Sequence, residues 1–145
     1  MKKSVIIVIL LFSSLVLLAE DFIMPIMIEN TGDDNVGRRL IYEIKEGIKE
    51  SKSMKLSLIN ELGIKISIVT LEGDRDNPGN YTLYSISFLW NNPEQIFPFY
   101  LTSSVGNCGS SRVEDVAKSI VAKTYEQCEQ IMKVILSLIQ ENEKK

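Results

Sequence analysis

The segment from Tyr100 to Arg112 carries the residue types closest to those of a binding site. The residue pattern indicates a strand that runs into a loop of glycines and hydroxyl side chains, followed by the start of a helix. Backbone amides at such a junction bind anions, with help from the positive end of the helix and from Arg112. A small-ligand or anion site here is the alternative function that the sequence offers, and it would be formed by Tyr100, Ser103, Ser104, Asn107, Cys108 and Arg112.

The same segment also fits a plain strand-to-helix turn in which Ser110 or Ser111 is the helix N-cap. It lacks the lysine and the spacing of a Walker loop, and it has too few glycines for a dinucleotide fingerprint. We expect no cofactor.

Cys108 is the first candidate for a catalytic group, because a thiol near a helix amino terminus can have a lowered pKa. A cysteine hydrolase also needs a general base, and the chain contains no histidine. We therefore expect no catalytic residue and no enzymatic activity.

Pairs of acidic residues are the second candidate, for glycosidase chemistry or calcium binding. Two of the three pairs lie at expected helix starts, where the helix dipole favours acids, and the third lies in a turn. No pair has the spacing of an EF-hand, so we expect no metal site. The pairs are Asp33 with Asp34, Asp74 with Asp76, and Glu114 with Asp115.

Apolar spacing predicts a helix over residues 36–50, preceded by turn and capping residues at 31–35. Alternating apolar residues predict strands at 22–28, 54–58, 64–71, 83–90 and 97–105. Pro25 cannot donate to a strand ladder, so the first of these is expected to be an edge strand or a bent one. Short turns predict that the last four strands form an antiparallel meander.

A second helix is predicted from Ser111 to about Glu143 by a continuous apolar stripe. A helix of that length spans about 50 Å, whereas a domain of this size has a radius of gyration near ~14 Å. Residues 128–145 are therefore expected to extend beyond the sheet. The predicted fold is an α+β two-layer sandwich, with an antiparallel meander sheet of four to five strands and two helices on one face.

Apolar residues on the extended part of this helix predict self-association as a homodimer, because an exposed stripe of that length usually finds a partner. The residues of this stripe are Ile131, Ile135, Leu138 and Ile139.

Two cysteines, Cys108 and Cys128, are the only ones in the chain. A disulfide requires Cα atoms within about 7 Å, but Cys128 lies about 25 Å along an unbroken helix that starts near Ser111. We predict no disulfide and a buried Cys128 on the apolar stripe.

Residues 1–19 have the layout of a secretory signal peptide: two lysines and then an apolar run. We expect cleavage after Ala19; retention of the segment as an amino-terminal anchor is the alternative. Cleavage leaves a single domain, 20–145, and changes the formal charge from -3 to -5. An acidic chain without a basic stripe argues against nucleic acid or a membrane surface as the partner.

Three sequence blocks carry a family resemblance, namely NVGRRLIYEIKEGIKESKSMKL, IVTLEG with YTLYSI, and YLTSSVGNCGSSRV. They resemble a family of small exported bacterial proteins of unassigned function, over residues 35–125. The general plan is also loosely similar to the amino-terminal domain of the periplasmic protein TolB. This resemblance implies an exported protein but no particular activity.

These observations together predict a periplasmic or secreted, non-enzymatic interaction module. We expect it to bind another envelope or secreted protein through its sheet face or its long helix. A small-ligand or anion-binding protein, with its site at Ser103–Arg112, is the alternative.

Overall fold

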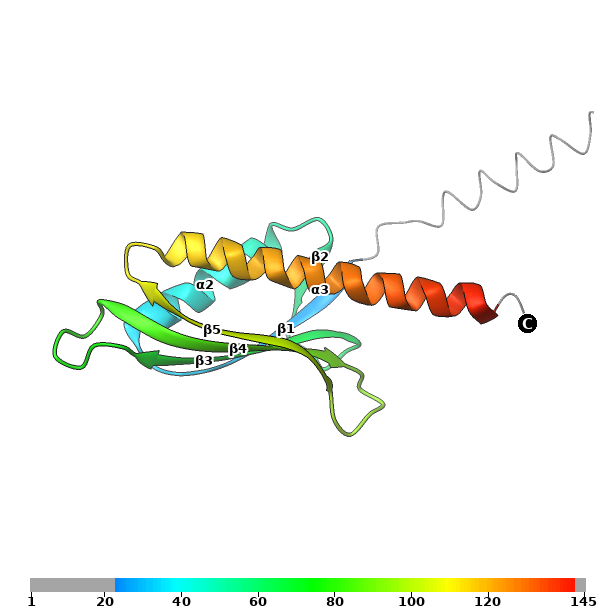
Figure 1. Ribbon diagram of the computed structural model, residues 1–145, viewed down its shortest axis with the longest axis horizontal. Coiled ribbons are helices and arrows are strands. Elements are labelled where there is room, and N and C mark those ends of the chain that lie inside the picture. The colour runs from blue at the N-terminus through cyan, green and yellow to red at the C-terminus, as the bar shows by residue number, and fades with distance from the viewer. Residues whose placement is uncertain (1–22, 143–145) are drawn as a thin grey trace, which may run out of the picture.

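The computed structural model describes residues 23–142, so the predicted signal segment and its cleavage position lie outside the described residues. One five-stranded sheet carries two helices on a single face (Figure 1). This arrangement confirms the α+β fold expected from the sequence. The elements in chain order are β1 (Met24–Thr31), α2 (Asn35–Lys49), β2 (Met54–Ser57), β3 (Gly63–Glu72), β4 (Tyr81–Asn91), β5 (Phe99–Gly109) and α3 (Val113–Asn142).

Helix α2 forms where its apolar spacing and its cap predict. Asp34 is the N-cap, and its Oδ1 accepts a hydrogen bond from the Gly37 backbone at 2.6 Å. This bond satisfies one of the free amides at the helix start. The apolar stripe of α2 packs on the sheet and is buried at Val36, Leu40, Ile41, Ile44 and Ile48.

The sheet is mixed rather than a single meander, with the strand order β2-β1-β3-β4-β5. Strands β3, β4 and β5 are antiparallel neighbours as predicted, but β1 pairs in parallel with both β2 and β3. The prediction that β2 belongs to the meander is therefore wrong. Helix α2 carries the chain back to the end of the sheet where β1 began, so the next strand runs parallel to β1.

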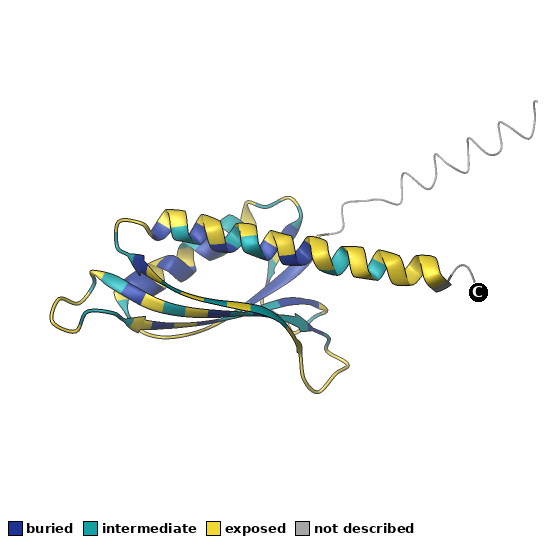
Figure 2. Ribbon diagram, in the orientation of Figure 1, coloured by how far each residue is buried: buried dark blue, intermediate teal, exposed yellow. Residues whose placement is uncertain are grey.

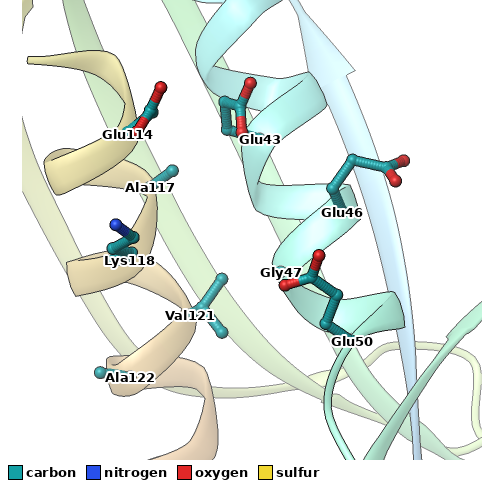
Figure 3. A pocket seen from close by; sticks show the side chains of 9 residues that line it. All are labelled: Glu43, Glu46, Gly47, Glu50, Glu114, Ala117, Lys118, Val121 and Ala122. Carbon is teal, nitrogen blue, oxygen red and sulfur yellow. The ribbon is translucent and has the colours of Figure 1, made fainter.

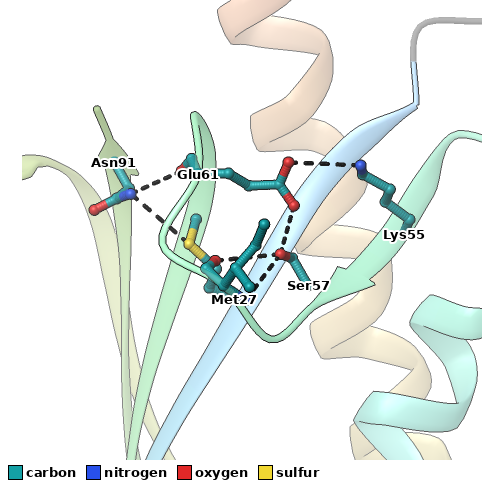
Figure 4. Close-up of polar contacts among 6 residues, drawn as sticks. Met27, Lys55, Ser57, Glu61 and Asn91 are labelled. Atoms are coloured by element: carbon teal, nitrogen blue, oxygen red, sulfur yellow. Dashed lines mark hydrogen bonds and ion pairs between the residues drawn. The ribbon is translucent and has the colours of Figure 1, made fainter. Parts of the chain in front are cut away.

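The segment 58–62 crosses from one side of β1 to the other (Figure 4). Because β2 has only four residues, this segment has little distance to cover. Polar contacts hold it: the Asn91 amide donates to the Glu61 carbonyl at 2.8 Å, and Glu61 forms an ion pair with Lys55 at 3.5 Å. The Asn91 amide also lies 3.7 Å from the Met27 sulfur. These contacts tie the connecting segment to both β2 and β4.

Pro25 lies in an interior strand, so of the two predicted alternatives, an edge strand or a bent one, the edge strand is wrong. The register between β1 and β3 begins only at Ile26, one residue after Pro25, so the missing amide costs the sheet little. A side chain at Gly63 would place its Cβ 2.3 Å from the Pro25 carbonyl oxygen. Glycine is therefore required where β3 starts beside the proline.

Helix α3 begins at Val113, slightly later than predicted. The Arg112 carbonyl accepts the first helical hydrogen bond, from Val116 at 3.0 Å. Arg112 therefore stands at the N-cap position, and the prediction of Ser110 or Ser111 there is wrong. With 30 residues, α3 is about 45 Å long. Its last part extends beyond the sheet, as predicted (Figure 1).

Candidate functional site

The segment predicted to be a binding loop is mostly strand. Strand β5 continues to Gly109, because its second half pairs with the first half of β4: Thr82 lies opposite Cys108 and Tyr84 opposite Gly106. A Cβ at Gly106 would lie 2.6 Å from the Tyr84 hydroxyl, so the tyrosine ring covers the glycine. The glycines in this segment serve strand pairing, and the loop predicted at Ser103–Arg112 shrinks to the short turn before α3.

The predicted ligand-binding residues do not converge on one place. Strand alternation puts Ser103 and Asn107 on the open face of the sheet, and Ser104 and Cys108 on the face that the helices cover. Arg112 lies in the turn before α3. Among these six residues, the side-chain hydrogen bond that the structure shows joins the hydroxyls of Tyr100 and Ser103 at 2.8 Å. The alternative function, an anion site, thus loses the loop on which it depended.

Cys108 is buried at the end of β5, and it is a free cysteine. Burial raises the pKa of its thiol above the ordinary value, although the positive charges of Arg112 and Arg39 act to lower it. A raised pKa keeps the thiol protonated at neutral pH, which disfavours a nucleophilic role.

An apolar groove that the sequence analysis did not predict lies where α3 leaves the sheet. Its volume is about 400 Å³. One wall is formed by side chains of α3, and the other by the last part of β4 and the first part of β5. The residues that line this terminal groove are Trp90, Phe99, Leu101, Gln127, Gln130, Ile131, Val134, Ile135 and Leu138.

Strand pairing builds the sheet wall of the terminal groove. Trp90 lies opposite Phe99, which places two aromatic rings at the same end of the sheet. A register shift after Phe88 inserts one extra residue into β5, and Leu101 then packs against the core. The helix wall continues the apolar stripe that is buried earlier along α3. The sequence showed this stripe but not the sheet end that faces it.

The terminal groove carries no charged side chain. It therefore has no group for acid-base or metal chemistry, but it can accept apolar side chains. Val134 and Leu138, on its rim, are 58% and 54% exposed. Such a surface is typical of an interface with another protein.

An acidic groove of about 400 Å³ lies between α2 and α3 (Figure 3). Glu43 and Glu46 come from α2, Glu50 is the C-cap of that helix, and Glu114 and Lys118 come from α3. Glu46 is already paired with Lys49 at 2.7 Å. Within residues 23–142, no cluster of three or more His, Cys, Asp or Glu side chains could hold a metal ion.

Small residues at the floor of this acidic groove explain its shape. Gly47 of α2 faces Val121 of α3, and a Cβ on the glycine would lie 3.0 Å from the valine methyl group. Close approach of two helices requires such small residues. The acidic groove is therefore a helix-packing seam with solvated acids on its rim.

The open face of the sheet holds a second exposed apolar surface. Val69 and Val105 lie in one cross-strand row, with Ser85 between them, and Leu71 and Leu83 are paired in the next row. All four apolar side chains are exposed, and Val105 is 80% exposed. We call these four residues the open-face patch.

Comparison with known proteins supports the fold and no more. No protein-family model matches the sequence, and no curated protein matches it. TolB from Acinetobacter baumannii is similar in structure, with a TM-score of 0.52 at 11% identity. The similarity covers 72% of this chain but only 28% of that TolB chain. It confirms the loose similarity in plan to TolB; the motif family remains a prediction.

Two further solved structures have lower TM-scores. A minor lipoprotein from Acinetobacter baumannii has a TM-score of 0.40 at 9% identity, over 72% of this chain and 92% of that one. PelC from Paraburkholderia phytofirmans, a dodecamer, has a TM-score of 0.43 at 11% identity, over 72% of this chain and 86% of that one.

Within residues 23–142, neither helix is both long and apolar enough to cross a membrane.

Proposed function

We propose that this protein is an exported, non-enzymatic interaction module that binds another exported protein through the terminal groove. The observation that carries the proposal is an uncharged apolar groove beside a helix whose apolar stripe runs past its own domain. Export is inferred from the apolar run that follows Lys2 and Lys3.

The partner element that best fits the terminal groove is an amphipathic helix. A groove with one helical wall accepts side chains at helical spacing, as in other helix-in-groove complexes. The two glutamines that line it, Gln127 and Gln130, can bond to polar groups at the edge of such a helix without adding charge. Trp90 is of a residue type that often carries binding energy at interfaces, and Phe99 is of a type that is enriched there.

A photo-crosslinker placed at Val134 tests the proposal in the envelope of the source cells. We expect a covalent adduct of one defined mass, identified by mass spectrometry as another exported protein. The control places the same crosslinker at Tyr42, which is equally exposed but lies on α2. The Tyr42 variant should give no such adduct.

Two outcomes would contradict the proposed function. If Val134 gives no adduct, or the same adducts as Tyr42, the groove binds no protein partner. If the adduct is a second copy of this chain, α3 mediates self-association through Ile131, Ile135, Leu138 and Ile139, as the sequence first suggested.

A further inference from the structure

Strand β5 is a free edge of the sheet, and it is long and uncharged. It has eleven residues, from Phe99 to Gly109, and none is acidic or basic. The opposite edge strand, β2, has four residues, carries Lys55 and is held by the Glu61 network. Proteins normally guard free edges with charges, prolines or short strands, because an unpaired edge can recruit another strand. Edge β2 is guarded in this way, and β5 is not.

The hydrogen-bond pattern identifies the backbone groups that are free on β5. The Ser110 amide donates to the Asn80 carbonyl at 2.8 Å, so this pair is a hydrogen-bonded one. Antiparallel ladders alternate between hydrogen-bonded and open pairs. The amide and carbonyl groups of Ser103, Val105 and Asn107 therefore point away from β4.

A contact from α3 agrees with this assignment. The Lys123 ammonium lies 3.4 Å from the Ser103 carbonyl oxygen, which it could not reach if that oxygen were paired with β4. The contact is longer than a good N–H···O bond, so an incoming amide can replace it. Among residues 23–142, no such contact reaches the backbone of Val105 or Asn107.

We propose that β5 pairs with β5 of a second copy, in antiparallel register about a two-fold axis at Val105. In this register Val105 lies opposite Val105 of the second copy, and Ser103 lies opposite Asn107 of the second copy. Apolar faces apolar and hydroxyl faces amide, which are favourable cross-strand pairs. The same three residues supply the free backbone groups on both sides.

The charge distribution supports a second copy as the partner. The chain is acidic, with a formal charge of -3, so contact between two copies is least opposed where no acidic side chain lies in the interface. The residues of β5 add no charge of their own to such a contact, and the one charged group beside the paired segment in the described residues is the Lys123 ammonium. A register that matches itself residue by residue also fits an isologous two-fold contact.

In such a dimer the two sheets would join into one continuous sheet, with equivalent faces on the same side. A two-fold axis perpendicular to the sheet keeps both helical layers on one side and both open-face patches on the other. Val105, which is 80% exposed in one copy, would then be flanked by its symmetry mate. The paired residues Ser103, Val105 and Asn107 do not line the terminal groove, although the groove uses the start of the same strand. The strand pairing can therefore fail while the proposed function holds, and the proposed function can fail while the pairing holds.

A cysteine at position 105 tests the register. Opposed residues in a hydrogen-bonded antiparallel pair have Cα atoms about 5.5 Å apart, which is within the range of a disulfide. We expect Val105→Cys to form a covalent dimer under mild oxidation. Ser87→Cys is the control: it lies on the same face but on the interior strand β4, so it should form no covalent dimer. The native cysteines are both buried.

A proline at the same position tests the hydrogen bonds. Val105→Pro removes an amide that β4 does not use, so the fold should persist by circular dichroism while the dimer becomes a monomer by light scattering. Val105→Thr keeps the amide and should remain a dimer. The proposal is overturned if the unmodified protein is a monomer at its highest soluble concentration, or if Val105→Cys cross-links no faster than Ser87→Cys.

Discussion

The two halves of α3 have the same apolar spacing but different surroundings. Along residues 113–128 the stripe is buried against α2 and the sheet, whereas along 129–142 most apolar side chains are about half exposed (Figure 2). The change occurs where the sheet ends, at Trp90 and Phe99. A helical period therefore specifies a stripe, but the length of the opposing sheet decides how much of it is buried.

Side-chain size differs between the halves in an unexpected direction. The buried half uses small residues such as Ala117, Thr124 and Cys128, which let α3 come close to its neighbours. Thr124 satisfies its hydroxyl by donating to the Ile120 carbonyl at 2.9 Å. The exposed half carries the larger Ile135 and Leu138. Large apolar residues placed where their own domain does not cover them fit a surface that a partner covers.

The largest expected effect in this comparison is on stability, from truncating one isoleucine in each half. Ile120 is 5% exposed, so Ile120→Ala should lower the free energy of unfolding by about 2–5 kcal/mol, through lost burial and an unfilled cavity. Ile135→Ala, in the half-covered groove, should cost less than about 1 kcal/mol. Urea unfolding of both variants measures the difference. Equal losses would mean that the second half is as much a part of the core as the first.

A pH-dependent effect is expected from Cys128. Burial raises the pKa of Cys128 to about 11. A pKa raised by folding means that this thiol stabilises the fold below its unfolded value, about 9, and that the contribution is lost as the pH rises to about 11. The difference in unfolding midpoint between the unmodified protein and Cys128→Ala should therefore shrink across this range. A difference that stays constant would contradict the assignment.

The same comparison can be made with thiol labelling. Cys108 and Cys128 should both react with maleimide only after unfolding, and non-reducing mass spectrometry should find two free thiols. A cysteine placed at Val134, in the exposed half, should react at once. A loss of two mass units in the native protein would instead reveal a disulfide.

The smallest expected effect on stability comes from removing the end of the helix. Truncation after Lys133 keeps Ile131 and Met132, which pack against the core, and deletes the exposed residues that follow. We expect the free energy of unfolding to change by less than about 1 kcal/mol, while the terminal groove loses the part of its helix wall formed by Val134, Ile135 and Leu138. Calorimetry measures the first effect, and crosslinking from Phe99 measures the second. A large loss of stability would show that the tail holds the domain together.

The candidate site illustrates what sequence reasoning can and cannot find. The stripe on α3 was visible, because Ile131, Ile135 and Leu138 follow a helical period. The sheet wall was not, because Trp90 and Leu101 become neighbours of that stripe only through strand register and a bulge. The glycine-rich segment was misinterpreted for the converse reason: Gly106 is typical of a loop until Tyr84 pairs opposite it.

The sequence by itself determined the local elements. Alternation specifies β3 and β4, and the 3.6-residue period specifies α2 and α3, because these patterns depend only on neighbours along the chain. Tertiary structure alone decided the order of the strands. Whether β2 pairs with β1 or with β3 depends on which side of β1 the chain adds each strand. That choice rests on packing between residues far apart in sequence, such as Asn91 against the crossing at Glu61, and no local pattern records it.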